Sequence, residues 1–297
     1  MIRFSICGAA SYACGELLRL MVNHPETQVA HLADSFAAGR RIQDEHPALM
    51  GFYDQEILPL NDETIAQIVE DSDVVFTAVD AGTVCGIAEK VLAGGKKFID
   101  FGADIRFRDA KVWEKWYHLD HPNYEMTKKA VYCIPEIQRD LAKGKSLISN
   151  PGCYPTATTL GLYPALKEGL VVENTIVVDA KSGYTGAGRR PAPNKLLAEA
   201  SNSFCAYALG GSHRHTPEIE QNIAYLTGKD LMKPETWQFI NFQPHLTPQI
   251  RGIEVTIYAT LNKDVTNDEL YELYQRYYKD EYFVRVFPAN KPVQTKW

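Results

Sequence analysis

One cysteine lies in a segment whose residue types favour a reactive thiol. Residues 149–158 read SNPGCYPTAT and place Cys153 directly after an Asn-Pro-Gly turn. The SLIS before the turn is strand-like, and the TATTLGLYPALKEGL after it has apolar residues at helical spacing, so we expect a strand-to-helix junction. The amides and the dipole of a helix N-terminus lower the pKa of a thiol, and the same amides can hold an oxyanion. We therefore predict that Cys153 is a nucleophile.

The other five cysteines have apolar or helical surroundings, where small buried thiols are usual. They never fall in a CxxC pair, so we expect neither a disulfide framework nor a zinc site. We predict buried, unreactive thiols at Cys7, Cys14, Cys85, Cys133 and Cys205.

Two histidines stand two residues apart in GGSHRHTPEIEQN, just before a Pro-Glu helix start. His213 and His215 would supply a base, or a partner for a thiolate, from a loop. The same pair could bind zinc, but no acidic or thiol group accompanies it at metal-ligand spacing. We therefore predict an acid–base site and no metal.

A turn near the N-terminus has the character of a dinucleotide-binding loop. In CGAASYACGELL, Gly8 ends a strand and a helix is expected to begin around Gly15 or Glu16. Backbone amides in such a turn can hold a pyrophosphate at the helix N-terminus. Only Gly8 stands where a glycine-rich turn needs glycine, since Ser11 and Cys14 occupy the other two places. A tight turn without a ligand is the alternative.

The segment ADSFAAGRR follows the second strand, where dinucleotide-binding domains contact the adenosine ribose. A lone acid, Asp34, would bind a 2′-hydroxyl. Ser35 with Arg40 and Arg41 would instead receive a 2′-phosphate, and two arginines in a glycine-containing loop suit a dianion. We predict the phosphorylated cofactor, with an exposed basic loop as the alternative.

Two weaker segments offer donors for an anion. DFGADIRF places Arg106 just past a strand end, and SGYTGAGRRPAPN surrounds Ser182 with glycines before Arg189. A surface arginine and an ordinary turn are the alternatives.

Composition narrows the class of partner. The chain has 297 residues, 45% of them hydrophobic, and a net charge of −6. Attachment to nucleic acid or to an anionic membrane needs concentrated Lys and Arg, so we expect a small-molecule partner. No apolar run is long enough to span a membrane, and the N-terminus lacks a signal-peptide layout, so we expect a cytoplasmic protein.

The elements that must position these residues divide at about residue 148. In residues 1–148, short apolar runs alternate with helical stretches, which predicts a Rossmann-like, doubly wound α/β domain with a parallel sheet. Residues 149–297 have longer alternating strands, which predict an α+β domain with a mostly antiparallel sheet. Thr266 and Glu269 form a capping-box pattern before ELYELYQRYYKDEY.

Taken together, the chain resembles the N-acetyl-gamma-glutamyl-phosphate reductase family of arginine biosynthesis, which is related to aspartate-semialdehyde dehydrogenase. The resemblance runs in the family's order over nearly the whole chain, and its segments are SNPGCYPTA, AKSGYTGAGR, HRHTPEI, PHLTPQIRGI and the weaker DFGADIRF and YCIPEI. It implies an oxidoreductase that reduces N-acetyl-L-glutamyl 5-phosphate to the semialdehyde with NADPH through a cysteine thioester. Cys153 would attack the acyl phosphate, phosphate would leave, and hydride would reduce the thioester.

The resemblance also implies roles for individual residues. One of His213 and His215 would be the acid and base, and we favour His215. The substrate would meet Asn150, Arg106, Glu218 and Arg251. The cofactor would meet Gly8, Ala10, Ser11, Tyr12, Ser35, Arg40, Ser182, Gly183 and Gly186. The family's habit implies a homodimer or homotetramer.

Three departures from the family pattern bear on these expectations. The chain has GAASYAC where the family has a turn close to GASGYTG, and it has AVDAG, with Asp80, where a Leu-Pro-His-Gly turn is usual. The family continues past KPVQTKW through a glycine- and alanine-rich helix, which we expect to be absent here. Alternatives are a related reductase of aminoadipyl or aspartyl phosphate, and a non-catalytic dinucleotide sensor.

Overall fold

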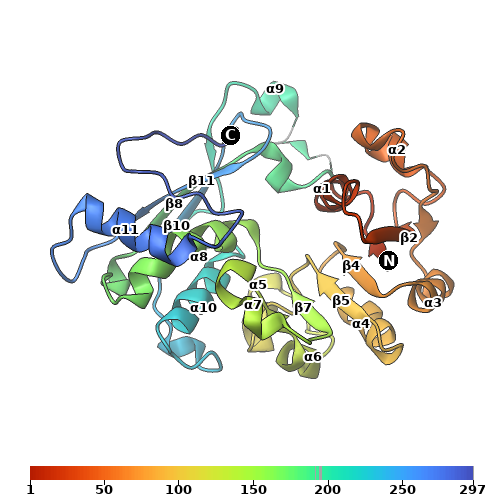
Figure 1. Ribbon diagram of the computed structural model, residues 1–297, viewed down its shortest axis with the longest axis horizontal. Helices are drawn as coiled ribbons and strands as arrows, with labels where there is room; N and C mark the ends of the chain where they lie inside the picture. Colours follow the sequence, from red (N-terminus) through yellow and green to blue (C-terminus); the bar gives the residue numbers. More distant parts are fainter. Residues whose placement is uncertain (191, 194–195, 297) are drawn as a thin grey trace. The chain divides into compact units, whose positions relative to one another are not determined.

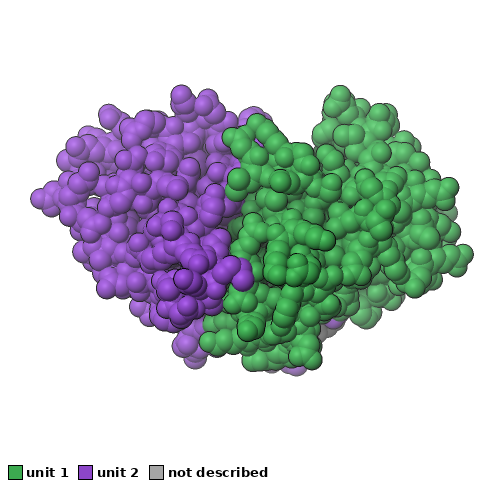
Figure 2. Space-filling view, turned by 90° about the horizontal axis from the view of Figure 1, so that it is seen from below, with its two compact units in different colours: residues 1–133, 140–151 green, residues 134–139, 152–297 purple. Residues whose placement is uncertain are grey.

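The computed structural model describes residues 1–190, 192–193 and 196–296, and it divides into two compact units. Unit 1 comprises residues 1–133 and 140–151, and unit 2 comprises residues 134–139 and the chain from Gly152 onward (Figure 2). The chain therefore enters unit 2 first between Cys133 and Ile134, returns to unit 1 at Asp140, and enters unit 2 again between Pro151 and Gly152. Trp297, the predicted end of the second domain, lies outside the described residues.

Unit 1 is built on a seven-stranded parallel sheet in the order β3-β2-β1-β4-β5-β7-β6 (Figure 1). The strands are β1 (Ile2–Cys7), β2 (Thr27–Asp34), β3 (Leu58–Pro59), β4 (Val74–Thr77), β5 (Lys97–Asp100), β6 (Val131–Tyr132) and β7 (Leu147–Ser149). This confirms the predicted parallel sheet. The two-residue strands β3 and β6 are too short to show a pattern in the sequence.

Both faces of this sheet are covered by apolar packing. Phe4 and Ile6 of β1 belong to one core cluster, whereas Cys7 belongs to a second. Because successive side chains of a strand point to opposite faces, the two clusters lie on opposite sides of the sheet. The doubly wound architecture predicted from the sequence is therefore confirmed.

Helices connect the strands of unit 1, and side-chain caps fix where several begin. They are α1 (Tyr12–Met21), α2 (Ile42–Glu45), α3 (Asp62–Asp71), α4 (Val84–Ala93), α5 (Ala110–Tyr117) and α6 (Tyr124–Lys129), with a 3-10 turn η1 (Pro47–Leu49). Helix α7 (Pro135–Ala142) has residues in both units. Helix α1 begins three residues earlier than the predicted Gly15, because the Ser11 hydroxyl accepts the Cys14 amide at 3.2 Å and caps the helix.

Unit 2 has a four-stranded mixed sheet in the order β11-β8-β10-β9. The strands are β8 (Val177–Ser182), β9 (Cys205–Ala206), β10 (Asn241–Leu246) and β11 (Ile253–Tyr258). β8 and β10 run parallel, and the two outer pairings are antiparallel. The predicted α+β domain with a mostly antiparallel sheet is confirmed.

The helices of unit 2 are α8 (Cys153–Lys167), α9 (Leu197–Ala200), α10 (Thr216–Leu226) and α11 (Asn267–Tyr278), with 3-10 turns η2 (Glu173–Thr175), η3 (Tyr184–Ala187) and η5 (Pro234–Thr236). Three of these helices, α8, α10 and α11, pack on the sheet of unit 2 through one core cluster. This cluster joins Leu162 of α8, Ile219 of α10 and Leu273 of α11 to Val178 of β8. The predicted capping box is present at the start of α11.

Among the described residues, no helix is both long enough and apolar enough to cross a membrane.

Candidate active site

Cys153 is the first residue of α8, four residues beyond the end of β7. Gly152 is the N-cap of the helix and has extended backbone angles, φ −67° and ψ 159°. The Cys153 side chain is exposed, as the predicted junction of strand and helix requires. A thiol at this position faces the positive end of the helix dipole and the amides of the first turn.

Four other cysteines are buried as predicted, and all six lie within the described residues without forming a disulfide. Burial raises the pKa of Cys7, Cys14 and Cys85 to about 12, so these thiols stay protonated. The prediction is wrong for Cys205, which is exposed. It lies in β9, a two-residue edge strand that pairs with β10, so the short apolar setting does not bury it.

The two predicted histidines lie against the residue that follows Cys153. The rings of His213 and His215 are 4.8 Å apart, and their centroids lie 5.5 Å and 5.9 Å from that of Tyr154. His215 is the N-cap of α10, which packs beside α8. Unit 2 thus brings both histidines to the start of the helix that carries the thiol.

A hydrogen bond and burial limit the ability of the His213 ring to act as a base. The His213 Nδ1 accepts the backbone amide of His215 at 3.0 Å, which leaves the ring proton on Nε2. Burial, aided by the charge of Arg214, lowers the pKa of His213 to about 4. His213 is therefore neutral near pH 7 and is a weak base for a thiol.

Glu218 is fully buried near the start of α10, and its carboxylate reaches the thiol-bearing helix. Its Oε1 accepts the Gly152 amide at 2.8 Å. A negative charge beside the N-cap of α8 also complements the dipole of that helix. Glu218, predicted to position substrate, is placed here against the backbone just before Cys153.

The segment with Ser182, Gly183 and Gly186 leaves β8 and packs closely against residues 250–252. A Cβ on Gly183 would lie 2.8 Å from the backbone of Ile250 and Arg251, and one on Gly186 would lie 2.6 Å from the Ser182 hydroxyl. The Gly183 amide donates to the Gly252 carbonyl at 2.9 Å. Close backbone approach explains Gly183, and it sets the predicted cofactor loop beside the predicted substrate residue Arg251.

In unit 1, the predicted dinucleotide turn lies where the strand order reverses, between β1 and β4. Ligands of doubly wound sheets bind at this switch point. Gly8 has φ +89°, and a Cβ there would come within 2.3 Å of the Ala78 carbonyl oxygen. The turn continues through Ala10 and Ser11 to Tyr12, the first residue of α1.

Asp34 braces this turn from the end of β2. Its carboxylate is buried and accepts the Ala10 amide at 3.1 Å, and its other oxygen accepts the amides of Phe36 and Ala37. The next residue, Ser35, is exposed, as is Arg40, whose guanidinium pairs with Glu45 at 2.8 Å.

His46 contacts the turn, although no local pattern in the sequence indicates this. Its Nε2 lies 3.0 Å from the Ala9 carbonyl oxygen, and its ring fills the space beside Gly15, where a Cβ would lie 2.5 Å from Nδ1. An isolated histidine 37 residues from its partner carries no local signal.

Arg106 and Asn150, the remaining predicted residues, meet at the ends of β5 and β7. Arg106 is 6% exposed and donates to the carbonyls of Asn150 at 3.0 Å and Phe101 at 2.8 Å. The Asn150 amide donates to the Asp100 carbonyl at 2.8 Å. The structure therefore brings this pair together in unit 1. In the described part of the chain, no cluster of three or more His, Cys, Asp or Glu side chains is placed to hold a metal.

Both halves of the chain match domains of one class of enzyme. Residues 3–145 match the semialdehyde dehydrogenase NAD binding domain, and residues 153–297 match the semialdehyde dehydrogenase dimerisation domain. Among solved structures, aspartate semialdehyde dehydrogenase II complexed with ASA from Vibrio cholerae covers the whole chain and 84% of its own length, with a TM-score of 0.68 and 11% identity. The enzyme with NADP from Candida albicans has a TM-score of 0.61 and 14% identity over 94% of this chain and 76% of its own. These likenesses show the fold.

Closer relatives identify the family. N-acetyl-gamma-glutamyl-phosphate reductase from Desulforudis audaxviator is 43% identical over the whole chain and 82% of its own length, and that of Desulforamulus reducens is 41% identical with the same coverage. The enzyme from Synechocystis is 40% identical over 99% of this chain and 81% of its own. The chain belongs to the N-acetyl-gamma-glutamyl-phosphate reductase family, as the resemblance indicated.

Proposed function

We propose that the chain catalyses the NADPH-dependent reductive dephosphorylation of N-acetyl-L-glutamyl 5-phosphate to N-acetyl-L-glutamate 5-semialdehyde. The observation that carries this proposal is the placement of Cys153 at the first residue of α8, with two histidine rings against the next residue. Relatives that match the whole chain over 82% of their own length bear the name of this reductase.

The chemistry begins at the Cys153 sulfur. The thiolate attacks the acyl carbon, a carbon–sulfur bond forms, and the carbon–oxygen bond to phosphate breaks, which gives a thioester and inorganic phosphate. First-turn amides of α8 would hold the oxyanion of the tetrahedral intermediate. The nicotinamide, when bound, supplies the hydride that brings the thioester to the aldehyde oxidation level. Breaking the carbon–sulfur bond then releases the semialdehyde and restores the thiolate.

His215 is the acid and base in this scheme. It would take the thiol proton before attack and return it to the Cys153 thiolate after the aldehyde is released. His213 suits this role less, because its Nδ1 is engaged by the His215 amide and its pKa is lowered by burial. Asn150, Arg106, Glu218 and Arg251 would position the acyl phosphate.

The structure offers a fitting cradle for the cofactor. At the switch point, Gly8 has a positive φ and packs against the Ala78 carbonyl with no room for a Cβ, and the start of α1 follows directly. The pyrophosphate would lie at Gly8, Ala10, Ser11 and Tyr12. Ser35 and Arg40, both exposed beyond β2, would receive the 2′-phosphate. Ser182, Gly183 and Gly186 would meet the nicotinamide. In this proposal residues 1–148 are the dinucleotide-binding domain, and residues 149–297 carry the chemistry.

We further propose a cytoplasmic homodimer or homotetramer, supported by the match of residues 153–297 to a dimerisation domain. The substrate alternatives are aminoadipyl and aspartyl phosphate. One methylene in a substrate pocket changes binding by roughly 1 to 3 kcal/mol, so the choice needs measurement.

The test uses the oxidative direction, with semialdehyde, inorganic phosphate and NADP⁺, and follows absorbance of the reduced nicotinamide. We expect turnover of N-acetylglutamate semialdehyde well above that of aspartate semialdehyde. Cys153→Ser should lose turnover completely and still bind NADPH, whereas Cys205→Ser, at the other exposed thiol, should keep it. A Cys153→Ser variant with most of its activity would refute the thioester mechanism, and cofactor binding without any turnover by the wild type would favour a dinucleotide sensor.

A further inference from the structure

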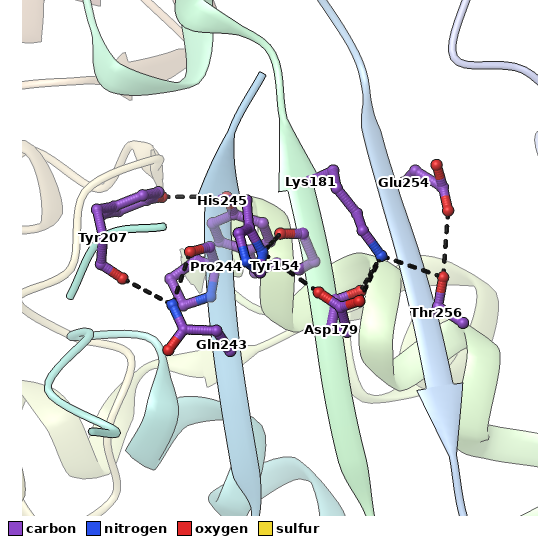
Figure 3. Close-up of polar contacts among 10 residues, drawn as sticks. Tyr154, Asp179, Lys181, Tyr207, Gln243, Pro244, His245, Glu254 and Thr256 are labelled. Atoms are coloured by element: carbon purple, nitrogen blue, oxygen red, sulfur yellow. Dashed lines mark hydrogen bonds and ion pairs between the residues drawn. The ribbon is translucent and has the colours of Figure 1, made fainter. Parts of the chain in front are cut away.

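Two tyrosine hydroxyls meet beside the proposed nucleophile and have no part in the scheme above. The phenol oxygens of Tyr154 and Tyr207 lie 3.0 Å apart, within hydrogen-bonding distance, although 53 residues separate them in the chain (Figure 3). Tyr154 follows Cys153 in the first turn of α8 and is 2% exposed. The hydroxyl pair therefore joins the start of the thiol-bearing helix to a distant segment.

That segment is held on the sheet of unit 2. The Tyr207 amide donates to the Pro244 carbonyl at 3.2 Å. The Gln243 side-chain amide donates to the Tyr207 carbonyl at 3.1 Å (Figure 3). Tyr207 is thus fixed to β10 through its backbone, six residues before His213. Its hydroxyl can therefore hold the Tyr154 side chain in one position through the hydrogen bond between the two.

The same two rings form part of a cage around His213. The His213 ring centroid lies 5.5 Å from that of Tyr154, 5.6 Å from Tyr207 and 5.4 Å from Phe242, each at a steep interplanar angle. Edge-to-face packing at these separations restricts how a ring can tilt. Since His213 accepts the His215 amide, a fixed His213 ring also fixes the backbone of His215.

We propose that Tyr154 and Tyr207 are positioning residues, whose hydroxyl pair locks the cage that holds His213 and, through it, sets His215 relative to Cys153. This inference rests on the proposed function of Cys153 and His215. In this proposal His213 supports the backbone of His215.

Both hydroxyls remain protonated at neutral pH, which a lock of this kind requires. Burial raises the pKa of Tyr154 and also that of Tyr207, for which the hydrogen bond with Tyr154 adds to the increase. The pair therefore contributes a neutral hydrogen bond and no charge.

The test compares Tyr207→Phe, Tyr154→Phe and the double variant in the full chain. We expect kcat to fall about 3- to 10-fold in Tyr207→Phe, the loss of roughly one net hydrogen bond, with KM within twofold of wild type. The double variant should be no slower than Tyr154→Phe, because one shared bond is lost in both. The rate of alkylation of Cys153 by iodoacetamide, followed by mass spectrometry of its peptide, should fall with kcat.

A matched control removes a tyrosine hydroxyl of α11 that donates to the backbone of α8 at a distance from the thiol. Tyr278 is buried and donates to the Leu160 carbonyl of α8 at 2.6 Å, so Tyr278→Phe should lower thermal stability and leave kcat and alkylation unchanged. Unchanged kcat and alkylation in Tyr207→Phe, or additive losses in the double variant, would overturn the proposal. If the wild type shows no turnover, the proposed function fails, and the alkylation rates still decide whether the pair positions the thiol's surroundings.

Discussion

Glu218 offers a sharp test of how the thiol-bearing helix is held. Its side chain is fully buried, and its carboxylate accepts the Gly152 amide at 2.8 Å. A hydrogen bond to a charged group contributes about 1.5 to 3 kcal/mol, and leaving a buried amide unpaired costs a similar amount. We therefore expect Glu218→Ala to lower the free energy of unfolding by about 3 kcal/mol, with the added loss of packing.

Glu218→Gln keeps an acceptor of the same shape and removes the charge. Its expected loss is about 1 to 2 kcal/mol, since the amide oxygen still meets Gly152 while the interaction with the helix dipole is lost. Urea denaturation measures both variants, and steady-state kinetics of Glu218→Gln separates two roles. A lower kcat with unchanged KM fits a residue that positions the backbone before Cys153, whereas a raised KM fits direct contact with substrate. An unfolding free energy of Glu218→Ala within 0.5 kcal/mol of wild type, the range of ordinary surface changes, would refute the reasoning.

Three further predictions concern the cofactor turn, the 2′-phosphate and pH. Gly8→Ala should lower the free energy of unfolding by about 2 kcal/mol or more, because Gly8 has φ +89° and a Cβ there would lie 2.3 Å from the Ala78 oxygen. Calorimetry should show that this variant no longer binds NADPH. Gly39→Ala, with φ +81° and open space around the added Cβ, is the control for backbone strain alone. Arg40→Ala should weaken NADPH about 10-fold and leave NADH unchanged; an unaltered preference would remove Arg40 from this role. For His213, the pKa of about 4 lies below the ordinary 6.5, so the unfolded chain binds more protons and the free energy of unfolding falls as pH drops from 6.5 towards 4. His213→Asn should flatten this fall in denaturation series, and an identical pH dependence would contradict the assignment.

Local patterns in the sequence were sufficient for the longer strands, the capping box of α11 and the junction at Cys153. The Asn-Pro-Gly turn between SLIS and an amphipathic run specifies a strand end and a helix start within a few residues. Helix α1 begins earlier than predicted, because Ser11 is its N-cap and accepts the Cys14 amide.

Such local patterns could not predict contacts between residues that lie far apart in the sequence. Tyr207 meets Tyr154 across 53 residues, and His46 meets Ala9 across 37. A lone tyrosine or histidine has no periodicity to reveal a partner. The register of β9 against β10, which carries Tyr207 to its place, depends on pairing between residues far apart in the chain.

The altered cofactor turn, GAASYAC, can be explained from its backbone. Only Gly8 has a positive φ in this segment, and Ser11, with φ −69°, uses its hydroxyl as the cap of α1. Cys14 is fully buried in the core cluster that also holds Leu18, so its side chain points into packing and away from solvent. The two missing glycines thus stand at positions whose backbone any residue can adopt. The approach of a pyrophosphate then depends on Gly8 and on the backbone at Ala10, whose amide donates to Asp34. Gly8→Ala therefore tests the turn more directly than a glycine in place of Ser11 or Cys14.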